Sequence, residues 1–400
     1  MVQAAILGYG TVGAGVLQVL NMNHETIARR VGDEVNVKYV LDLREFPGTP
    51  AEKILTHNYQ DILDDPEVGI VVETMGGLKP AYEFTKQALL AGKNVCTSNK
   101  ELVAEHGVEL RKIAREHSVN YLFEASCGGG IPIIRAINES MTADEFEEVS
   151  GILNGTTNYI LTSMADEGKS FEEALKEAQA KGYAELHPEA DVEGYDACRK
   201  IAILSSLAYG KHISYKDVQT EGITAVDQAD IAYAKALGLK IKLIAKSSRS
   251  EKGTWAMVAP MMIGSENQLY TVDGVMNAVF VKGNALGDAM FYGSGAGSLP
   301  TASAVAGDVL ECAKHLKETI RFDDTSEAME LLAPDEVTVA FFARTDASEE
   351  AVKKVFGEVQ TIRLPEYPDE TGFVTSVMTE AAFAEACKAV GGVKKFIRRG

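Results

Sequence analysis

Residues 3–13 read QAAILGYGTVG, an apolar strand that runs into the pattern Gly8-x-Gly10-x-x-Gly13. In such a turn the first glycine permits the tight bend, the second lets a pyrophosphate approach the backbone, and the third lets helix and strand pack closely. Apolar residues with helical spacing follow at 16–20. This order predicts a dinucleotide-binding loop with phosphates at the helix N-terminus. The alternative is a glycine turn without a ligand.

Four further strands are expected after this loop, with helical stretches between them. The strands are at 35–43, 68–74, 93–99 and 119–126, and the clearest helical stretches are at 80–92 and 101–117. This alternation predicts a doubly wound parallel sheet of the Rossmann type, an α/β fold. Such a sheet binds ligands outside the carboxyl ends of its strands. Thr74 and Lys100 stand at strand ends and are candidate ligand contacts, although a solvated helix-start lysine is the alternative for Lys100.

The choice between NAD and NADP depends on the residues after the second strand. An acidic residue there usually accepts the adenosine ribose hydroxyls, which favours NAD. Asp42 fits that position, but Arg44 lies two residues on and could instead meet a 2′-phosphate. The sequence leaves both cofactors open and leans toward NAD.

Composition restricts the class of protein. The 400 residues suffice for two or three domains, and the formal net charge of −19 argues against binding nucleic acid or an anionic membrane surface. The sequence has no apolar run long enough for a membrane span, and its start lacks the features of a signal peptide. Its five cysteines are scattered, with no CxxC pair. Free thiols in a reducing cytoplasm are therefore expected, and a thiolate zinc site is not.

A glycine-rich stretch, EASCGGGIP at 124–132, follows the last of these strands. In an extended segment alternate carbonyls point the same way, so those of Cys127, Gly129 and Ile131 could converge, with the Glu124 carboxylate closing the shell. Ligand sets made only of oxygen suit a hard cation. A flexible hinge between domains is the alternative.

Residues 181–204 read KGYAELHPEADVEGYDACRKIAIL and gather five carboxylates ahead of an apolar helical run. Asp196 and Lys200 are four residues apart, so they share one face of a helix. The simplest interpretation is a surface pair at a helix start, worth a few tenths of a kcal/mol. The other interpretation is a functional pair, and this stretch alone favours the simpler one.

Several motifs in one order give the chain a close resemblance to the homoserine dehydrogenase family, up to about residue 325. They are GYGTVG (8–13), TSNK (97–100), EASCGGGIPI (124–133), GILNGTTNYIL (151–161), KGYAELHPEADVEGYDACRK (181–200) and GAGSLPTASAV (295–305). The resemblance implies NAD(P)-dependent interconversion of L-homoserine and L-aspartate 4-semialdehyde, on the route to threonine, methionine and isoleucine. It also implies a nucleotide-binding domain over 1–130, completed by about 295–325, and an α+β substrate-binding and dimerisation domain over 131–294.

The resemblance assigns roles to individual residues. Lys200 matches the family's proton donor, and Lys100 matches a lysine that touches both substrate and nicotinamide. Substrate binding is expected at Glu185, Asp191, Asp196, Lys100, Gly155, Thr156 and Tyr183. Cofactor binding is expected at Gly8, Tyr9, Gly10, Thr11, Val12, Gly13, Asp42, Thr74, Lys100, Gly182 and Gly297. A structural sodium ion is expected at Glu124, Cys127, Gly129 and Ile131.

The chain departs from the family pattern at two of these places. Cys127 stands where valine is expected, a change that a backbone ligand should tolerate. The second strand ends in Leu41-Asp42-Leu43 instead of Arg-Asp-Leu, so an arginine for the 2′-phosphate is missing, which adds to the lean toward NAD.

Two other functions compete with this resemblance. One is another NAD-dependent amino-acid dehydrogenase that acts on an amine carbon. The other is a nucleotide-sensing regulator with an inactive site. The intact set of Lys100, Glu185, Asp196 and Lys200 argues against the regulator, because a binding module needs no proton donor.

Residues 335–400 read as strand, helix, two strands, helix and strand. This βαββαβ order is ferredoxin-like and resembles an ACT domain. Thr345-Asp346-Ala347-Ser348 replaces the Asp-x-Pro-Gly turn usual after the first strand. We therefore expect a role in assembly, as a homodimer or a homotetramer through this domain, and little threonine sensing. A chain that ends near Pro334 is expected to stay dimeric and active. Because the sequence starts at the nucleotide domain, a monofunctional enzyme is expected.

Overall fold

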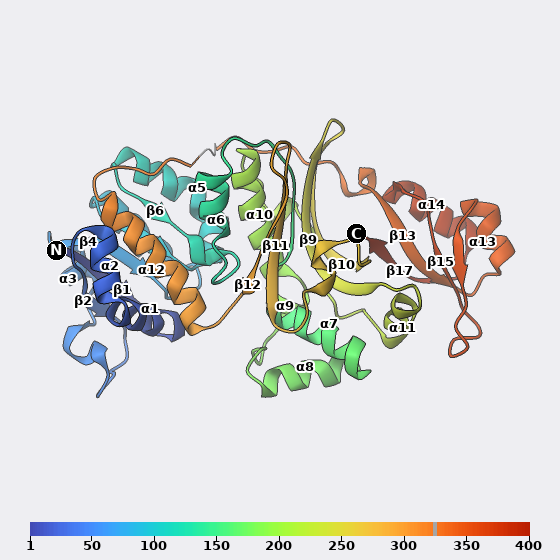
Figure 1. The fold of residues 1–400 in the computed structure, drawn as a ribbon, viewed down its shortest axis with the longest axis horizontal. Helices are drawn as coiled ribbons and strands as arrows, with labels where there is room; N and C mark the ends of the chain where they lie inside the picture. The colour runs from blue at the N-terminus through green and yellow to red at the C-terminus, as the bar shows by residue number, and fades with distance from the viewer. Residues whose placement is uncertain (323–325) are drawn as a thin grey trace. The chain divides into compact units, whose positions relative to one another are not determined.

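The computed structural model describes residues 1–322 and 326–400 (Figure 1). They group into two compact units: unit 1 comprises 1–145, 202–215 and 291–328, and unit 2 comprises 146–201, 216–290 and 329–400. The division into three domains stays a prediction, and residues 323–325 of its range 295–325 lie outside the described residues. No helix in the described part of the chain is both long and apolar enough to cross a membrane.

Unit 1 contains a six-stranded sheet in the order β3-β2-β1-β4-β5-β6. Its strands are β1 (Val2–Leu7), β2 (Val35–Leu41), β3 (Leu55–Thr56), β4 (Val68–Glu73), β5 (Asn94–Thr97) and β6 (Tyr121–Leu122). All neighbouring strands are parallel. The order runs outward in both directions from β1 and β4, so the predicted doubly wound sheet is confirmed, and its ligand-binding crevice is expected at this switch point.

Helices cover both faces of this sheet. They are α1 (Thr11–Met22), α2 (His24–Val31), α3 (Tyr59–Leu63), α4 (Ala81–Leu90), α5 (Lys100–Glu116), α6 (Ile133–Arg135) and α12 (Ser298–Lys314). On one face, Ile6 and Val72 of the sheet share a core with Val16 of α1 and Val305 of α12. Helix α12, orange in Figure 1, packs on α1, so a segment from late in the sequence belongs to this unit.

The strand predicted at 119–126 is shorter than expected. Only Tyr121–Leu122 pairs with β5, and Glu124–Ser126 forms a single 3₁₀ turn. The Glu124 carboxylate explains the change, because it accepts the backbone N–H groups of Ile134 and Arg135, both at 2.8 Å. These bonds tie the end of the strand to α6.

Unit 2 is built on a mixed sheet in the order β12-β11-β7-β9-β10-β17-β13-β15-β14. Its strands before the C-terminal segment are β7 (Phe146–Ile152), β8 (Gln219–Thr220), β9 (Lys240–Ser250), β10 (Gly253–Ile263), β11 (Met276–Gly283) and β12 (Gly287–Ser294). Its helices there are α7 (Gly155–Glu167), α8 (Phe171–Ala180), α9 (Glu189–Val192), α10 (Tyr195–Tyr209) and α11 (Gln228–Ala236). Helix α10 starts in unit 2 and its residues from 202 onward belong to unit 1.

The C-terminal segment has the predicted βαββαβ order. Its elements are β13 (Thr338–Thr345), α13 (Glu349–Phe356), β14 (Gln360–Ile362), β15 (Thr371–Val374), the short β16 (Met378–Thr379), α14 (Glu380–Val390) and β17 (Val393–Arg399). Its own core joins Phe341, Val352, Phe373 and Phe383, and the rings of Phe341 and Phe383 stack at 3.9 Å. The strand order β17-β13-β15-β14 is that of a ferredoxin-like sheet.

This segment is less separable than expected from the sequence. Its last strand, β17, pairs in parallel with β10, with Met261 opposite Arg398 and Met262 opposite Arg399. The same strand pairs antiparallel with β13. One sheet therefore continues from the middle of unit 2 into the C-terminal segment. Removal of residues after Pro334 would expose the edge of β10.

Candidate active site

The glycine loop joins β1 to α1. Gly8 has a φ of +90°, a conformation that side chains disfavour. A Cβ atom at Gly13 would lie 2.0 Å from the Gly8 carbonyl oxygen, so helix and loop touch there. At Gly10, by contrast, no atom of the described residues apart from its chain neighbours lies within 4 Å of such a Cβ. The protein itself gives no steric reason for glycine at this position, as expected where a ligand approaches the backbone.

Two polar side chains hold this loop in place. Asp42 follows β2, and its carboxylate accepts the Tyr9 N–H at 2.8 Å and the guanidinium of Arg44 at 3.0 Å. The hydrogen bonds from Arg44 hold the pKa of the Asp42 carboxyl well below its usual range. The Thr74 hydroxyl donates to the Gly8 carbonyl at 2.9 Å. Thr74 thus supports the loop through its side chain.

A distant segment also reaches the glycine loop. Gly297, with a φ of +119°, precedes α12, and the Ser298 hydroxyl donates to the Thr11 carbonyl at 2.9 Å. A Cβ at Gly15 would lie 2.8 Å from the Ser298 Oγ. The structure therefore places Gly297 beside the first turn of α1, which contains Thr11 and Val12. Its role in cofactor binding stays a prediction.

Lys100 is the first residue of α5, and the preceding Asn99 caps the helix by accepting the Leu102 N–H at 3.1 Å. Nearby, Glu73 ends β4 fully buried and accepts the Thr97 hydroxyl at 2.6 Å. Burial raises the pKa of Glu73 despite this bond. We did not single out Glu73 in the sequence. The available signal was an acidic residue at the carboxyl end of a buried strand.

The predicted cation loop is shaped by contacts within the protein. A Cβ at Gly129 would lie 2.4 Å from the Gly295 carbonyl oxygen, so close backbone approach explains this glycine without an ion. The Ile131 carbonyl accepts the Ile133 N–H at 2.9 Å. Glu124 is 3% exposed, and burial raises its pKa although two backbone N–H groups donate to it. The Cys127 carbonyl belongs to the same loop, and the cation site stays a prediction.

In unit 2, Asp196 and Lys200 lie on the first turns of α10 as the sequence predicted. They do not form a surface pair, because Asp196 is 2% and Lys200 is 8% exposed. The Lys200 ammonium donates to the Asp196 Oδ2 at 2.7 Å and to the Leu153 carbonyl at 2.8 Å. A buried ammonium is costly unless such partners hold it. The simpler interpretation of this pair is therefore wrong.

Asn154 organises the carboxylates around this lysine. Its amide nitrogen donates to Asp191 at 2.8 Å and to Asp196 at 2.9 Å. Its amide oxygen caps α7 by accepting the Thr157 N–H at 2.9 Å. Sequence analysis missed this residue. The only local signal was an asparagine directly before a helix, which indicates a cap but not contact with side chains about 40 positions later.

The remaining predicted substrate residues lie near α7 and α8. The Thr156 hydroxyl donates to the Tyr183 carbonyl at 2.6 Å, and a Cβ at Gly155 would lie 2.7 Å from the Val275 carbonyl oxygen. Gly182 has a φ of +73° in the turn after α8. Glu185 is exposed, and no described residue forms a hydrogen bond with its carboxylate. The structure therefore groups Asp191, Asp196 and Lys200 but does not join Glu185 to them.

The sequence of this chain is similar to known proteins over most of its length. The family model described as homoserine dehydrogenase, NAD binding domain, matches residues 8–124, and the model described as homoserine dehydrogenase matches 132–310. A homoserine dehydrogenase of Neisseria gonorrhoeae is 39% identical over 87% of this chain and 82% of its own length. The chain belongs to the homoserine dehydrogenase family. It is therefore an oxidoreductase with an NAD(P)-binding domain, as the glycine loop predicted.

Solved homoserine dehydrogenases share the fold. The structure from Thiobacillus denitrificans matches with a TM-score of 0.92 and 36% identity, and covers 100% of this chain and 98% of that one. A hyperthermophilic archaeal homoserine dehydrogenase in complex with NADPH matches with a TM-score of 0.67 and 26% identity. It covers 80% of this chain and 99% of that one, so about one-fifth of this chain has no counterpart there.

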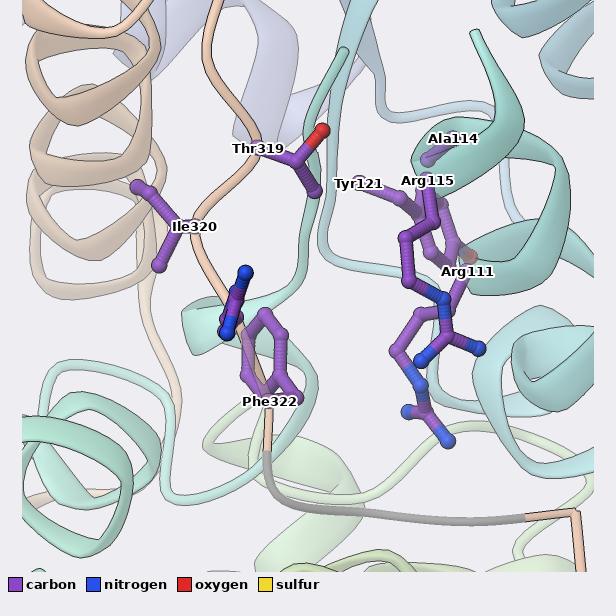
Figure 2. Close-up of a pocket in the computed structure, with 8 residues that line it drawn as sticks. Arg111, Ala114, Arg115, Tyr121, Thr319, Ile320 and Phe322 are labelled. Atoms are coloured by element: carbon purple, nitrogen blue, oxygen red, sulfur yellow. The ribbon is translucent and has the colours of Figure 1, made fainter. Parts of the chain in front are cut away.

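Unit 1 also contains a cavity of about 500 Å³. None of the described residues that line it is a predicted substrate, cofactor or metal residue. Figure 2 shows Arg111 and Arg115 beside Tyr121, with Thr319 and Phe322 across the cavity. Arg111 is eleven residues after Lys100 on α5, about 16 Å along the helix axis. Arg115 is in the last turn of α5, where arginine side chains commonly bond to the terminal carbonyls. The cavity therefore lies away from the end of α5 at which Lys100 stands.

Proposed function

We propose that Lys200 donates the proton when aspartate 4-semialdehyde is reduced to homoserine. Bound NAD(P)H supplies a hydride to the carbonyl carbon. The carbonyl electron pair moves to oxygen, which takes a proton from the Lys200 ammonium to form the alcohol. In the oxidation of homoserine, neutral Lys200 accepts the hydroxyl proton. The observation that supports this role is the buried ammonium held by Asp196 and the Leu153 carbonyl.

The acidic residues of this region suit an amino-acid substrate. Homoserine carries an ammonium group, which pairs most strongly with carboxylates. Asp191 and Asp196 are both fixed by Asn154, and Glu185 offers an exposed carboxylate nearby in the sequence. We infer that these three residues select for the substrate ammonium, with Lys100 as a further contact to substrate and nicotinamide.

The reaction is tested by following NADH or NADPH formation with homoserine, and with aspartate and other amino alcohols as competitors. Oxidation of homoserine alone supports the proposal. Reaction at an amine carbon, detected as ammonia release, would favour the other amino-acid dehydrogenase. Nucleotide binding without turnover of any of these compounds would favour a regulator with an inactive site.

A Glu185→Ala variant should raise the KM for homoserine. The lost carboxylate is a charged partner worth about 1.5–3 kcal/mol, or roughly ten- to hundredfold in binding. Because Glu185 has no described side-chain partner, folding stability should stay near that of the parent chain. Steady-state kinetics with varied homoserine measures the effect, and Glu189→Ala, also an exposed carboxylate of this segment, is the control. An unchanged KM would assign the acidic segment another purpose.

For the cofactor, we infer a preference for NAD over NADP. Asp42 offers a carboxylate at the end of β2, and Arg44 is bonded to this carboxylate at 3.0 Å, with a longer hydrogen bond to the Tyr9 carbonyl at 3.4 Å. A carboxylate accepts ribose hydroxyls and repels a 2′-phosphate.

An Asp42→Asn variant should therefore shift the ratio of kcat/KM values toward NADP by about tenfold or more. The variant removes one negative charge and loosens Arg44, which is 64% exposed and available to a phosphate. Glu45→Gln neutralises a nearby exposed carboxylate that contacts His57 and should leave the ratio unchanged. An Asp42→Asn ratio equal to that of the parent chain would contradict the assignment.

We further infer a structural sodium ion held by the carbonyls of Cys127, Gly129 and Ile131 and by Glu124, because such an oxygen set suits a hard cation. Assembly is inferred as a homodimer, with a homotetramer through the ACT-like residues 335–400 as the alternative. A cytoplasmic enzyme on the route to threonine, methionine and isoleucine agrees with the acidic net charge and the five free cysteines.

A further inference from the structure

We propose that Arg398, on the last strand of the chain, is a positioning residue for the substrate-binding turn and acts through Glu221. The proposal rests on the substrate-binding roles proposed for Asp191 and Asp196. It gives the C-terminal segment a part in substrate binding that does not require an effector. The contacts that link Arg398 to this turn all lie within unit 2.

Arg398 is a buried arginine with two carboxylate partners. It is 2% exposed, although it sits two residues from the end of the chain. Its guanidinium donates to both oxygens of Glu221, at 2.7 and 2.8 Å, and to both oxygens of Glu380, at 2.6 and 3.0 Å. Bidentate pairs of this kind fix the relative orientation of the groups as well as their distance. Arg398 therefore holds Glu221 in one place.

Glu221 belongs to the segment that follows β8. Its N–H donates to the Val258 carbonyl of β10 at 2.7 Å, so the segment runs beside the same strand that pairs with β17. Glu221 is thus held through its backbone by β10 and through its carboxylate by Arg398, with a longer hydrogen bond from the Gln219 side-chain amide at 3.2 Å. Its side chain is 42% exposed, so the arginine supplies the restraint that burial does not.

The next residues contact the substrate-binding turn directly. The Ile223 N–H donates to the Val192 carbonyl at 2.8 Å. A Cβ atom at Gly222 would lie 2.3 Å from the Val192 carbonyl oxygen and 2.5 Å from the Cα of Glu193. No side chain fits between the two backbones. A shift of the segment at Glu221 should therefore displace the turn at 192–194 directly, because the two backbones are in contact.

This turn sits between the proposed substrate residues. Asp191 precedes it, and Gly194 begins the hydrogen bonding of α10 by accepting the Cys198 N–H at 2.9 Å. Asp196 lies two residues after Gly194 and faces Lys200. Displacement of the turn would change the spacing of Asp191 and Asp196 around Asn154. Weaker substrate binding is the expected consequence, with a smaller effect on the proton transfer itself.

The two carboxylates bound by Arg398 provide a matched test. Glu221→Gln and Glu380→Gln each remove one charged partner of the same arginine, but Glu380 lies on α14 and not on the segment that contacts the turn. Glu221→Gln should raise the KM for homoserine about three- to tenfold, the effect of weakening one charge-assisted bond. Glu380→Gln should leave this KM within about twofold of the parent chain. Both should lower the unfolding temperature by similar amounts.

Further measurements separate positioning from general destabilisation. The KM for NAD and the kcat at saturating homoserine should stay near the parental values in Glu221→Gln. Arg398→Lys, which keeps the charge but not the fork, should reproduce the rise in the KM for homoserine. Equal homoserine KM values in Glu221→Gln and Glu380→Gln would overturn the proposal while leaving the reaction intact. If the parent chain itself does not oxidise homoserine, the proposed function fails instead.

Discussion

A Lys200→Ala variant is expected to turn over homoserine roughly 10²–10⁴-fold more slowly than the parent chain, the usual contribution of general acid–base catalysis. The buried ammonium is held at 2.7 Å from Asp196 and 2.8 Å from the Leu153 carbonyl, and alanine has no proton to give at that place. Affinity for NAD(H) should change little, because Lys200 belongs to unit 2 and the glycine loop to unit 1. Steady-state turnover and NADH fluorescence titration measure the two quantities.

Loss of folding must be separated from loss of the proton donor. Removal of Lys200 leaves the buried Asp196 without its ammonium partner, which costs about 3–5 kcal/mol for a typical buried pair. Adding Asp196→Asn should restore stability but not turnover. Lys242→Ala is a matched control, since Lys242 is 2% exposed and donates to Asp273 at 2.7 Å. It should lose stability and keep turnover. A Lys200→Ala protein with more than half of the parental turnover would remove Lys200 from the mechanism.

The parts of the fold that depend on local sequence could be predicted. The bend at Gly8 and the contact between Gly13 and the Gly8 carbonyl are set within six residues, so their spacing in the sequence reveals them. The spacing of Asp196 and Lys200 likewise placed both side chains on one helical face. Their burial could not be read in the same way, because it depends on Leu153 and Asn154, which lie more than 40 positions earlier.

Non-local contacts account for the other differences. The carbonyl of Gly129 stays a predicted ion ligand, but its sequence position does not reveal the close approach to the Gly295 carbonyl oxygen, far along the chain. Arg398 is one of four basic residues at 394–399 in the sequence, and it is buried on a strand that pairs with both β10 and β13. In each case a local pattern gave the right kind of element. Contacts with residues far away in the sequence then determine the role of each residue.

A chain that ends at Pro334 is expected to fail to form a stable unit 2, in contrast to the expectation from sequence. The deletion removes β17 and leaves the edge of β10 unpaired, and exposed edges of this kind promote aggregation. It also removes both buried arginines of the segment. Arg344, 5% exposed, lies 2.7 Å from Asp227 and 3.0 Å from Asp230.

The expected loss of stability is large because of Asp230. This carboxylate is fully buried, and burial already raises its pKa with Arg344 beside it. Loss of the arginine from such a pair costs about 3–5 kcal/mol. The stability of a whole domain is only about 5–15 kcal/mol. The buried Asp230 carboxylate without Arg344 and the lost β17 pairing should together unfold unit 2. Most of the expressed protein should therefore not oxidise homoserine.

The comparison of full-length and truncated chains has readouts that separate the two units. Light scattering and thermal unfolding report on assembly and stability, NADH titration on unit 1, and homoserine oxidation on the whole enzyme. NADH binding should persist, because no residue after 334 belongs to unit 1.

Adding Asp230→Asn to the truncated chain should recover part of the soluble protein, because it removes the buried carboxylate that has lost Arg344. A truncated chain as soluble and active as the full chain would show that the paired edge and the two arginines are dispensable. Activity with and without millimolar threonine completes the comparison, since inhibition of the full chain that disappears on truncation would assign residues 335–400 a sensing role.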